Sequence, residues 1–207
     1  MASVEQLKAA GVVEDVEGFD TSALGGSFSV TYPGGGFAPG DEVPAPQTHV
    51  PPSAVSYKTE GNAGKKYTLI FTDPDAPDRA AHLFREFVHH VVSDVTAESL
   101  AAGGALTGTT VLDYLGVGAP CNSGLHRYVF LLFEQPEGST PASLAAAFEG
   151  RGGKKVCVAA KQAGLGPVVA ATFYQSQWCE EIDAVHTAMG WLPPKEFRSP
   201  AQNAANP

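Results

Sequence analysis

YTLIFTDPDAPDR, residues 67–79, is the segment most informative about how this chain folds. Its first six residues are rich in β-branched and aromatic side chains and run into Asp73-Pro74, which predicts a strand that ends at a turn. Two carboxylates, Asp73 and Asp75, are held there by prolines that fix their own φ and restrict the preceding residue. Such a turn is either a stiff acidic element of a binding site or a turn whose carboxylates only accept local N–H groups.

Further strand patterns flank this segment on both sides. In the stretch 86–95, EFVHHVVSDV, side chains alternate between the two faces, so Phe87 and His89 share one face while His90 lies on the other. The two adjacent histidines therefore cannot both serve one site. In the stretch 126–134, HRYVFLLFE, His126 and Tyr128 share a face. The full set of expected strands is 27–32, 53–57, 67–72, 86–95, 126–134 and 168–174.

Helices are expected mainly near the two ends of the chain. Ser3 and Gln6 have the spacing of a capping box, and Gly11 is a typical helix stop. The stretch 178–189 has apolar residues at spacings of about 4, 3 and 4 and ends before Gly190, which predicts one helix. Many strands and few helices predict an all-β sandwich of one domain over 1–192 with peripheral helices, a long connection over 33–52 and a flexible tail over 193–207.

Charge and cysteine content restrict the partners and the compartment. The 207 residues include 13 basic and 22 acidic side chains, a net charge of −9, which disfavours nucleic acid and anionic membrane surfaces. Any anion binding must then depend on a few placed groups. Three cysteines without CxxC spacing and a start without an apolar signal segment indicate a reducing compartment, which we take to be the cytoplasm. The longest apolar run is too short to form a transmembrane segment.

Motifs for catalysis and cofactor binding are weak or absent in the sequence. A lone strand histidine such as His89 is commonly a core residue, and Gly116-Val117-Gly118 is followed by a strand, unlike a dinucleotide fingerprint. There is no GxSxG elbow and no HExxH, and Ser123 has no evident base at a fixed spacing. Two Asp and two His could hold zinc or iron, yet their spacing does not favour this. We therefore predict no cofactor and no metal.

Three segments together resemble one known family. Residues 67–79, the strand REFVHH at 85–90, and the pair YLGVGAP at 114–120 with GLHRYVF at 124–130 resemble, in order, the signatures of the phosphatidylethanolamine-binding protein family, which includes kinase-inhibitor-like members. The likeness covers roughly residues 25–190. It implies two antiparallel sheets with flanking helices, including a C-terminal one, and a pocket at one end that accepts phosphate-like anions and phospholipid head groups.

The resemblance also implies a set of site residues. Carried over position by position, the pocket consists of Asp73, Asp75, Pro77, Phe87, His89, Gly116, Gly118, Pro120, His126 and Tyr128. Many animal members have Trp where this chain has Phe87, and a pocket Tyr of theirs aligns with His186, which is then either a third imidazole or a solvated side chain. Cis peptide bonds are implied at Ala76–Pro77 and Arg85–Glu86.

These residues suggest how the pocket works. We expect an anion to accept hydrogen bonds from the glycine loop and both imidazoles, while Asp73 and Asp75 hold the histidines or the turn backbone and favour imidazolium. The leading interpretation is a non-catalytic regulator that binds such a head group and acts on a protein partner, a kinase or a protease. The alternative is an enzyme acting on a small substrate in the same Asp/His pocket. Lipid transport is disfavoured, because the pocket is sized for a head group.

Overall fold

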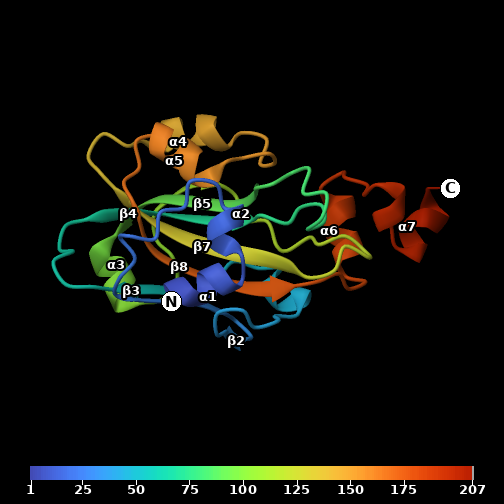
Figure 1. Ribbon diagram of the computed structural model, residues 1–207, viewed down its shortest axis with the longest axis horizontal. Coiled ribbons are helices and arrows are strands. Elements are labelled where there is room, and N and C mark those ends of the chain that lie inside the picture. The colour runs from blue at the N-terminus through green and yellow to red at the C-terminus, as the bar shows by residue number, and fades with distance from the viewer. Residues whose placement is uncertain (207) are drawn as a thin grey trace.

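Two antiparallel sheets form the body of the protein, which the computed structural model describes over residues 1–206 (Figure 1). The larger sheet has the order β6-β5-β4-β7-β8 and the smaller one the order β2-β1-β3. The strands are β1 (Ser27–Tyr32), β2 (Gly35–Gly36), β3 (Ala54–Lys58), β4 (Lys66–Asp73), β5 (Phe87–Thr96), β6 (Thr109–Leu112), β7 (His126–Gln135) and β8 (Val168–Ser176). The expected sandwich is confirmed, and each expected strand is present to within two residues.

The larger sheet is buried on both faces, which explains its nearly continuous apolar strands. On the side of the smaller sheet, an aromatic cluster forms the core, and the rings of Phe71 and Phe130 stack with centroids 4.3 Å apart. On the opposite side Ile70 and Leu131 belong to a second cluster, which includes Phe148 from a covering helix. Because β4 and β7 contribute side chains to both clusters, each of these strands is packed on two faces.

Short helices cover the second face and the edges of the sandwich. The predicted capping box of Ser3 and Gln6 is present at the start of α1. Figure 1 shows α4 and α5 together on one side of the larger sheet. These helices are α1 (Val4–Ala9), α2 (Val12–Asp15), α3 (Ala97–Ala102), α4 (Pro141–Phe148) and α5 (Val156–Gln162). The connection expected over 33–52 contains β2 and a 3-10 turn, η1 (Ala45–Thr48).

The C-terminal segment departs from the sequence-based expectation. The helix expected over 178–189 begins only at Ile182 and forms α6 (Ile182–Ala188). The stretch expected to be a flexible tail contains a 3-10 turn, η2 (Lys195–Phe197), and a helix, α7 (Pro200–Ala205), while Pro207 lies outside the described residues. A second capping box, made by Ser199 and Gln202, starts α7. Gln202 is largely buried, so this segment is packed against the domain.

Strand pairing gathers the candidate residues at one end of the larger sheet. Asp73, the last residue of β4, pairs with Phe87, the first residue of β5. His126 begins β7, which pairs with β4 on its other side. Figure 1 shows α6 and α7 at one end of the sandwich. The implied cis peptide bonds Ala76–Pro77 and Arg85–Glu86 are both present near this end.

Candidate functional site

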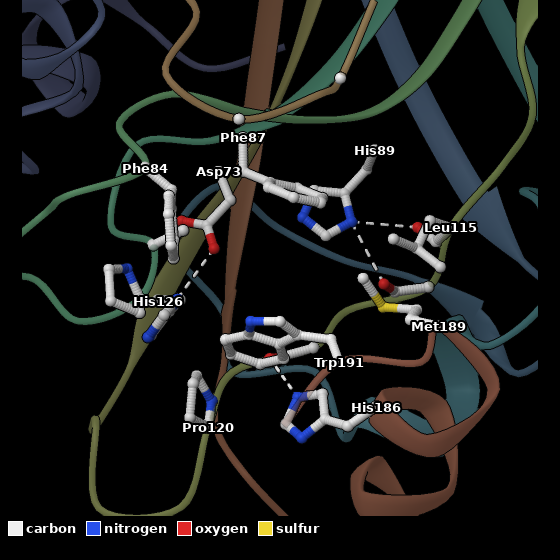
Figure 2. A pocket seen from close by; sticks show the side chains of 16 residues that line it. Asp73, Phe84, Phe87, His89, Leu115, Pro120, His126, His186, Met189 and Trp191 are labelled. Carbon is white, nitrogen blue, oxygen red and sulfur yellow. Dashed lines mark hydrogen bonds and ion pairs between the residues drawn. The ribbon is translucent and has the colours of Figure 1, made fainter. Parts of the chain in front are cut away.

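A cavity of about 250 Å³ lies where these strand ends meet (Figure 2). Nine of the eleven residues predicted for the site line it: Asp73, Pro77, Phe87, His89, Gly116, Gly118, Pro120, His126 and His186. Asp75 and Tyr128 do not line it. Seven lining residues were not predicted: Ala76, Phe84, Leu115, Gly150, Gly152, Met189 and Trp191. His90 packs edge-on against Tyr114 outside the lining, as the alternation of β5 predicts.

His126 and Asp73 form a buried pair at the cavity wall. His126 Nδ1 lies 2.8 Å from Asp73 Oδ2, and the two side chains are almost completely buried. The other carboxylate oxygen of Asp73 accepts the N–H of Asp75 at 2.6 Å, which fixes the carboxylate. Burial disfavours charge on His126, but the field of Asp73 and its hydrogen bond outweigh burial and raise the imidazole pKa. The cavity therefore has one imidazole that favours its charged form.

The imidazole of His89, unlike that of His126, favours its neutral form. Its Nδ1 lies 3.1 Å from the carbonyl oxygens of both Leu115 and Gly116, so Nδ1 must carry the proton. Burial lowers the pKa of His89 to about 4, which leaves the ring neutral at ordinary pH. Its Nε2 is buried and makes no hydrogen bond within residues 1–206. Figure 2 shows this nitrogen on the side of the ring away from Leu115, so the cavity wall offers an unpaired acceptor.

His186 is buried, which decides between the two alternatives left open by the sequence. Its Nε2 donates to the carbonyl oxygen of Gly118 at 2.9 Å, and its Nδ1 lies 3.1 Å from Gln202 Nε2. Burial lowers the pKa of this histidine as well. The ring of Trp191 packs edge-on against it with centroids 4.8 Å apart, at the cavity wall (Figure 2). His186 is thus a neutral wall residue with both nitrogens occupied.

Asp75 belongs to a structural ion pair instead of the cavity. Its carboxylate accepts from Arg127 Nε at 2.9 Å and from Arg127 Nη2 at 2.6 Å. The same guanidinium also donates to Asp15 Oδ2 at 2.6 Å, which ties α2 to β7. Burial alone would raise the pKa of Asp75, but the bonds from Arg127 lower it. Of the two roles expected for Asp73 and Asp75, holding a histidine or holding the backbone, Asp75 does not take the first directly. Its Oδ2 accepts the backbone N–H of Arg127 at 2.8 Å, and its charge still favours the His126 imidazolium.

The glycine loop presents carbonyls to the imidazoles. The Gly116 and Gly118 oxygens accept from His89 and His186 respectively, and the Gly118 N–H donates to the Tyr128 hydroxyl at 3.3 Å. The Gly118 N–H is therefore engaged in this arrangement, and donation from the N–H groups of the glycine loop to an anion stays a prediction. A Cβ at position 116 would lie 3.1 Å from the Thr48 oxygen, so glycine permits close packing on η1.

Ser123 acquires a partner that the sequence did not indicate. Its Oγ lies 2.9 Å from His126 Nε2 and also donates to the carbonyl oxygen of Pro120 at 2.7 Å. Both partners line the cavity. The only sequence signal was the three-residue separation of Ser123 and His126, which is uninformative in a turn of unknown shape.

Within residues 1–206, no group of three or more His, Cys, Asp or Glu side chains is arranged to hold a metal ion. The same residues contain no helix with the length and apolar character needed to cross a membrane.

Comparison with known proteins places these features in context. The family model of phosphatidylethanolamine-binding protein matches residues 33–175. An uncharacterized Saccharomyces cerevisiae protein, YLR179C, is 42% identical over 85 residues, and the match covers 40% of this chain and 42% of the yeast protein. The chain thus matches less than half the length of that relative.

Two solved structures are similar over most of the chain. Carboxypeptidase Y inhibitor, in the crystal structure of its complex with the cognate proteinase, has a TM-score of 0.69 and 27% identity, with coverage of 84% of this chain and 94% of that one. The phosphatidylethanolamine-binding protein from Plasmodium vivax has a TM-score of 0.72 and 20% identity, with coverage of 86% and 98%. The second likeness supports the fold alone.

Proposed function

The chain belongs to the phosphatidylethanolamine-binding protein family, and we propose that it is a binding and regulatory protein whose cavity holds the phosphate group of a small phosphorylated compound or of a phospholipid head group. The observation that carries this proposal is the pair of unlike imidazoles at the wall. His126 is held by Asp73 in a state that favours positive charge, and His89 offers an unpaired acceptor. A group that is both anionic and able to donate a proton satisfies both.

The monoprotonated phosphate of a monoester has this combination, whereas a phospholipid head group, being a phosphodiester, supplies only the negative charge. The negative charge of the monoester is attracted by the His126 imidazolium, and its remaining O–H can donate to His89 Nε2, which has no other partner among the described residues. Phosphate monoesters lose that proton near pH 6. As pH rises, the ligand loses its donor and His126 loses its charge, so the affinity falls for two independent reasons. This extends the pH dependence expected from the sequence.

The test compares phosphate with sulfate, an anion of similar shape that carries no O–H at these pH values. Thermal stabilisation by phosphate at pH 5.5 should exceed that by sulfate and that by phosphate at pH 8. His126→Gln should abolish the phosphate shift, whereas His90→Gln, which changes a histidine outside the lining, should retain it. Equal shifts at both pH values, or equal shifts with both anions, would contradict the proposed binding mode.

We further propose that the regulated partner is a protease. The support is the likeness to carboxypeptidase Y inhibitor at 27% identity over 84% of this chain. Inhibition of carboxypeptidase Y by the purified chain, measured with and without phosphate, is the direct test. No inhibition at micromolar concentrations would remove the protease proposal and leave the cavity proposal standing, since the two rest on different observations. A kinase partner would then be examined in the same way.

A further inference from the structure

We propose that Ser123, His126 and Asp73 form a serine–histidine–aspartate triad that hydrolyses small carboxylic esters. This activity goes beyond the proposed anion binding, although both involve His126. It gives a concrete form to the enzyme alternative that the sequence left open, because the serine now has a base. The inference rests on the geometry of three side chains from the ends of two strands and the turn before β7.

The order of contacts is that of a catalytic triad. Ser123 Oγ lies 2.9 Å from His126 Nε2, and His126 Nδ1 lies 2.8 Å from Asp73 Oδ2. Both distances are within the reach required between nucleophile and base, and between base and orienting group. Such triads are recognised by geometry and roles, whatever their order in the sequence. Here Ser123 would be the nucleophile, His126 the general base and acid, and Asp73 the group that fixes the imidazole tautomer.

The three side chains differ in exposure as their roles require. Asp73 is 3% exposed and His126 is 1% exposed, so the base and its orienting carboxylate are shielded from water. Ser123 is only partly buried. Its hydroxyl lies between the cavity-lining residues Pro120 and His126, within hydrogen-bonding distance of both. Ser123 lies next to the lining and not within it, so an ester carbonyl would reach its hydroxyl between these two residues.

Two backbone N–H groups next to the serine are candidates for binding the developing oxyanion, because they make no hydrogen bond within the described residues. Among the hydrogen bonds of residues 1–206, none uses the backbone N–H of Gly124 or Leu125, the two residues that follow Ser123. In other serine hydrolases the N–H of the residue after the nucleophile is one of the oxyanion donors. Gly124, with φ of 76°, carries no side chain that would obstruct approach to this N–H.

The proposed reaction needs only ester and water. The Ser123 oxygen attacks the ester carbonyl carbon while its proton moves to His126 Nε2. The carbon–oxygen bond to the alcohol then breaks, and His126 returns that proton to the departing alkoxide, which leaves an acyl-serine. Water attacks the acyl-serine, gives its proton to His126 and releases the acid. The proton goes back to Ser123, so the enzyme is restored.

The cavity restricts the acyl group to a small, uncharged one. Its volume of about 250 Å³ and its apolar wall residues Phe84, Phe87 and Trp191 fit acyl chains of a few carbons. Acetyl and butyryl esters of neutral alcohols are therefore the substrates to test first.

Catalysis requires neutral His126, and this sets its pH dependence. Asp73 at the end of β4 and Asp75 and Asp78 after it all favour the imidazolium, while the neighbouring guanidinium of Arg127 is engaged by Asp75. Because the Ser123 hydroxyl donates its proton to the carbonyl oxygen of Pro120, His126 Nε2 must be the donor in its contact with Ser123 Oγ. This is the arrangement expected when His126 is an imidazolium. Loss of the proton lets the hydroxyl turn toward Nε2. Hydrolysis should thus increase as pH rises, in the range where anion binding declines.

The test measures hydrolysis of p-nitrophenyl acetate and butyrate from pH 6 to 10, together with labelling of the wild-type protein by a fluorophosphonate probe. We expect probe attachment at Ser123 by peptide mapping, in step with loss of hydrolysis. Ser123→Ala should lower the rate at least about 100-fold, and Asp73→Asn should do so through the wrong imidazole tautomer. Ser22→Ala, which changes an exposed serine outside the lining, should leave the rate unchanged.

The outcomes separate this inference from the proposed anion binding. Absence of label on Ser123, or a rate in Ser123→Ala within tenfold of wild type, would overturn the triad whatever the phosphate result. If Ser123→Ala does not fold, mapping of the label on wild-type protein decides alone. A folded Ser123→Ala that keeps the phosphate-induced shift but lacks hydrolysis would show that the two activities are independent uses of one cavity.

Discussion

Arg127 is 1% exposed, and at the scale of single residues its charge is tolerable only because two carboxylates face it. Asp75 accepts two bonds from the guanidinium and Asp15 accepts a third. Replacing one partner of a buried pair leaves the other charge unsolvated and typically costs about 3–5 kcal/mol. We therefore expect Asp75→Asn to lower the free energy of unfolding by about that amount, as measured by urea denaturation.

The matched control for this prediction is Glu17→Gln. Glu17 pairs with Lys155 at 2.8 Å, but both side chains are more than half exposed. Ion pairs in contact with water contribute little, so the loss should be much smaller. Equal losses in the two variants would show that the Asp75–Arg127 pair is not the anchor that the geometry indicates.

At the scale of elements, Glu86 connects the start of β5 to the start of α5. Its Oε1 accepts the N–H of Val156, the first residue of α5, at 3.0 Å. Burial raises the pKa of Glu86 to about 8 from an ordinary value of 4.5. Between these values the folded protein holds a proton that the unfolded chain has released, so stability falls with rising pH, by at most about 1.4 kcal/mol per pH unit.

Glu86→Gln removes this dependence while keeping an oxygen for the Val156 N–H. Relative to wild type, the variant should gain stability progressively from pH 5 to pH 8, as followed by denaturant unfolding at each pH. Titration of other groups cancels in the difference between the two proteins. Parallel stability curves across this range would contradict the assigned protonation of Glu86.

Helix α7 offers a second prediction at this scale. Gln202 closes the capping box of α7 and also bonds His186 Nδ1 at 3.1 Å. Gln6 occupies the same box position in α1, is exposed and makes no contact with the cavity lining. Gln202→Ala should therefore destabilise the protein more than Gln6→Ala, by about 1 kcal/mol for the additional buried hydrogen bond. Thermal unfolding measures both, and indistinguishable losses would show that α7 does not support His186.

The elements were unequally predictable from the sequence, for a physical reason. Strands β4, β5 and β7 are buried on both faces, so their β-branched and aromatic runs are long and clear. Helices α3, α4 and α5 have only six to eight residues and little helical pattern of their own. They depend on packing of a few side chains, such as Leu144 and Phe148 in α4, against the sheet.

At the scale of the whole molecule, the residues of the site were also unequally predictable from the sequence. His89 and His126 could be assigned to one cavity because both stand in recognisable motifs, and they lie near the ends of β5 and β7, the two strands that flank β4. Gly150, Gly152 and Trp191 reach the cavity from distant loops, and no local pattern encodes that approach. The contact of Ser123 with His126 depends on the shape of one turn, which spacing alone does not define.

The net charge of the protein determines how it should behave at a membrane surface. With a charge of −9, the protein as a whole should be repelled by an anionic bilayer, although its cavity offers a local site for a phosphate group. We expect no co-sedimentation with vesicles rich in phosphatidylserine in 20 mM salt, where repulsion extends furthest. Phosphoethanolamine in solution should still raise the thermal unfolding temperature at pH 5.5. Vesicle binding that strengthens as salt is lowered would require a basic surface that outweighs the net charge, and would contradict the view that anion recognition is confined to the cavity.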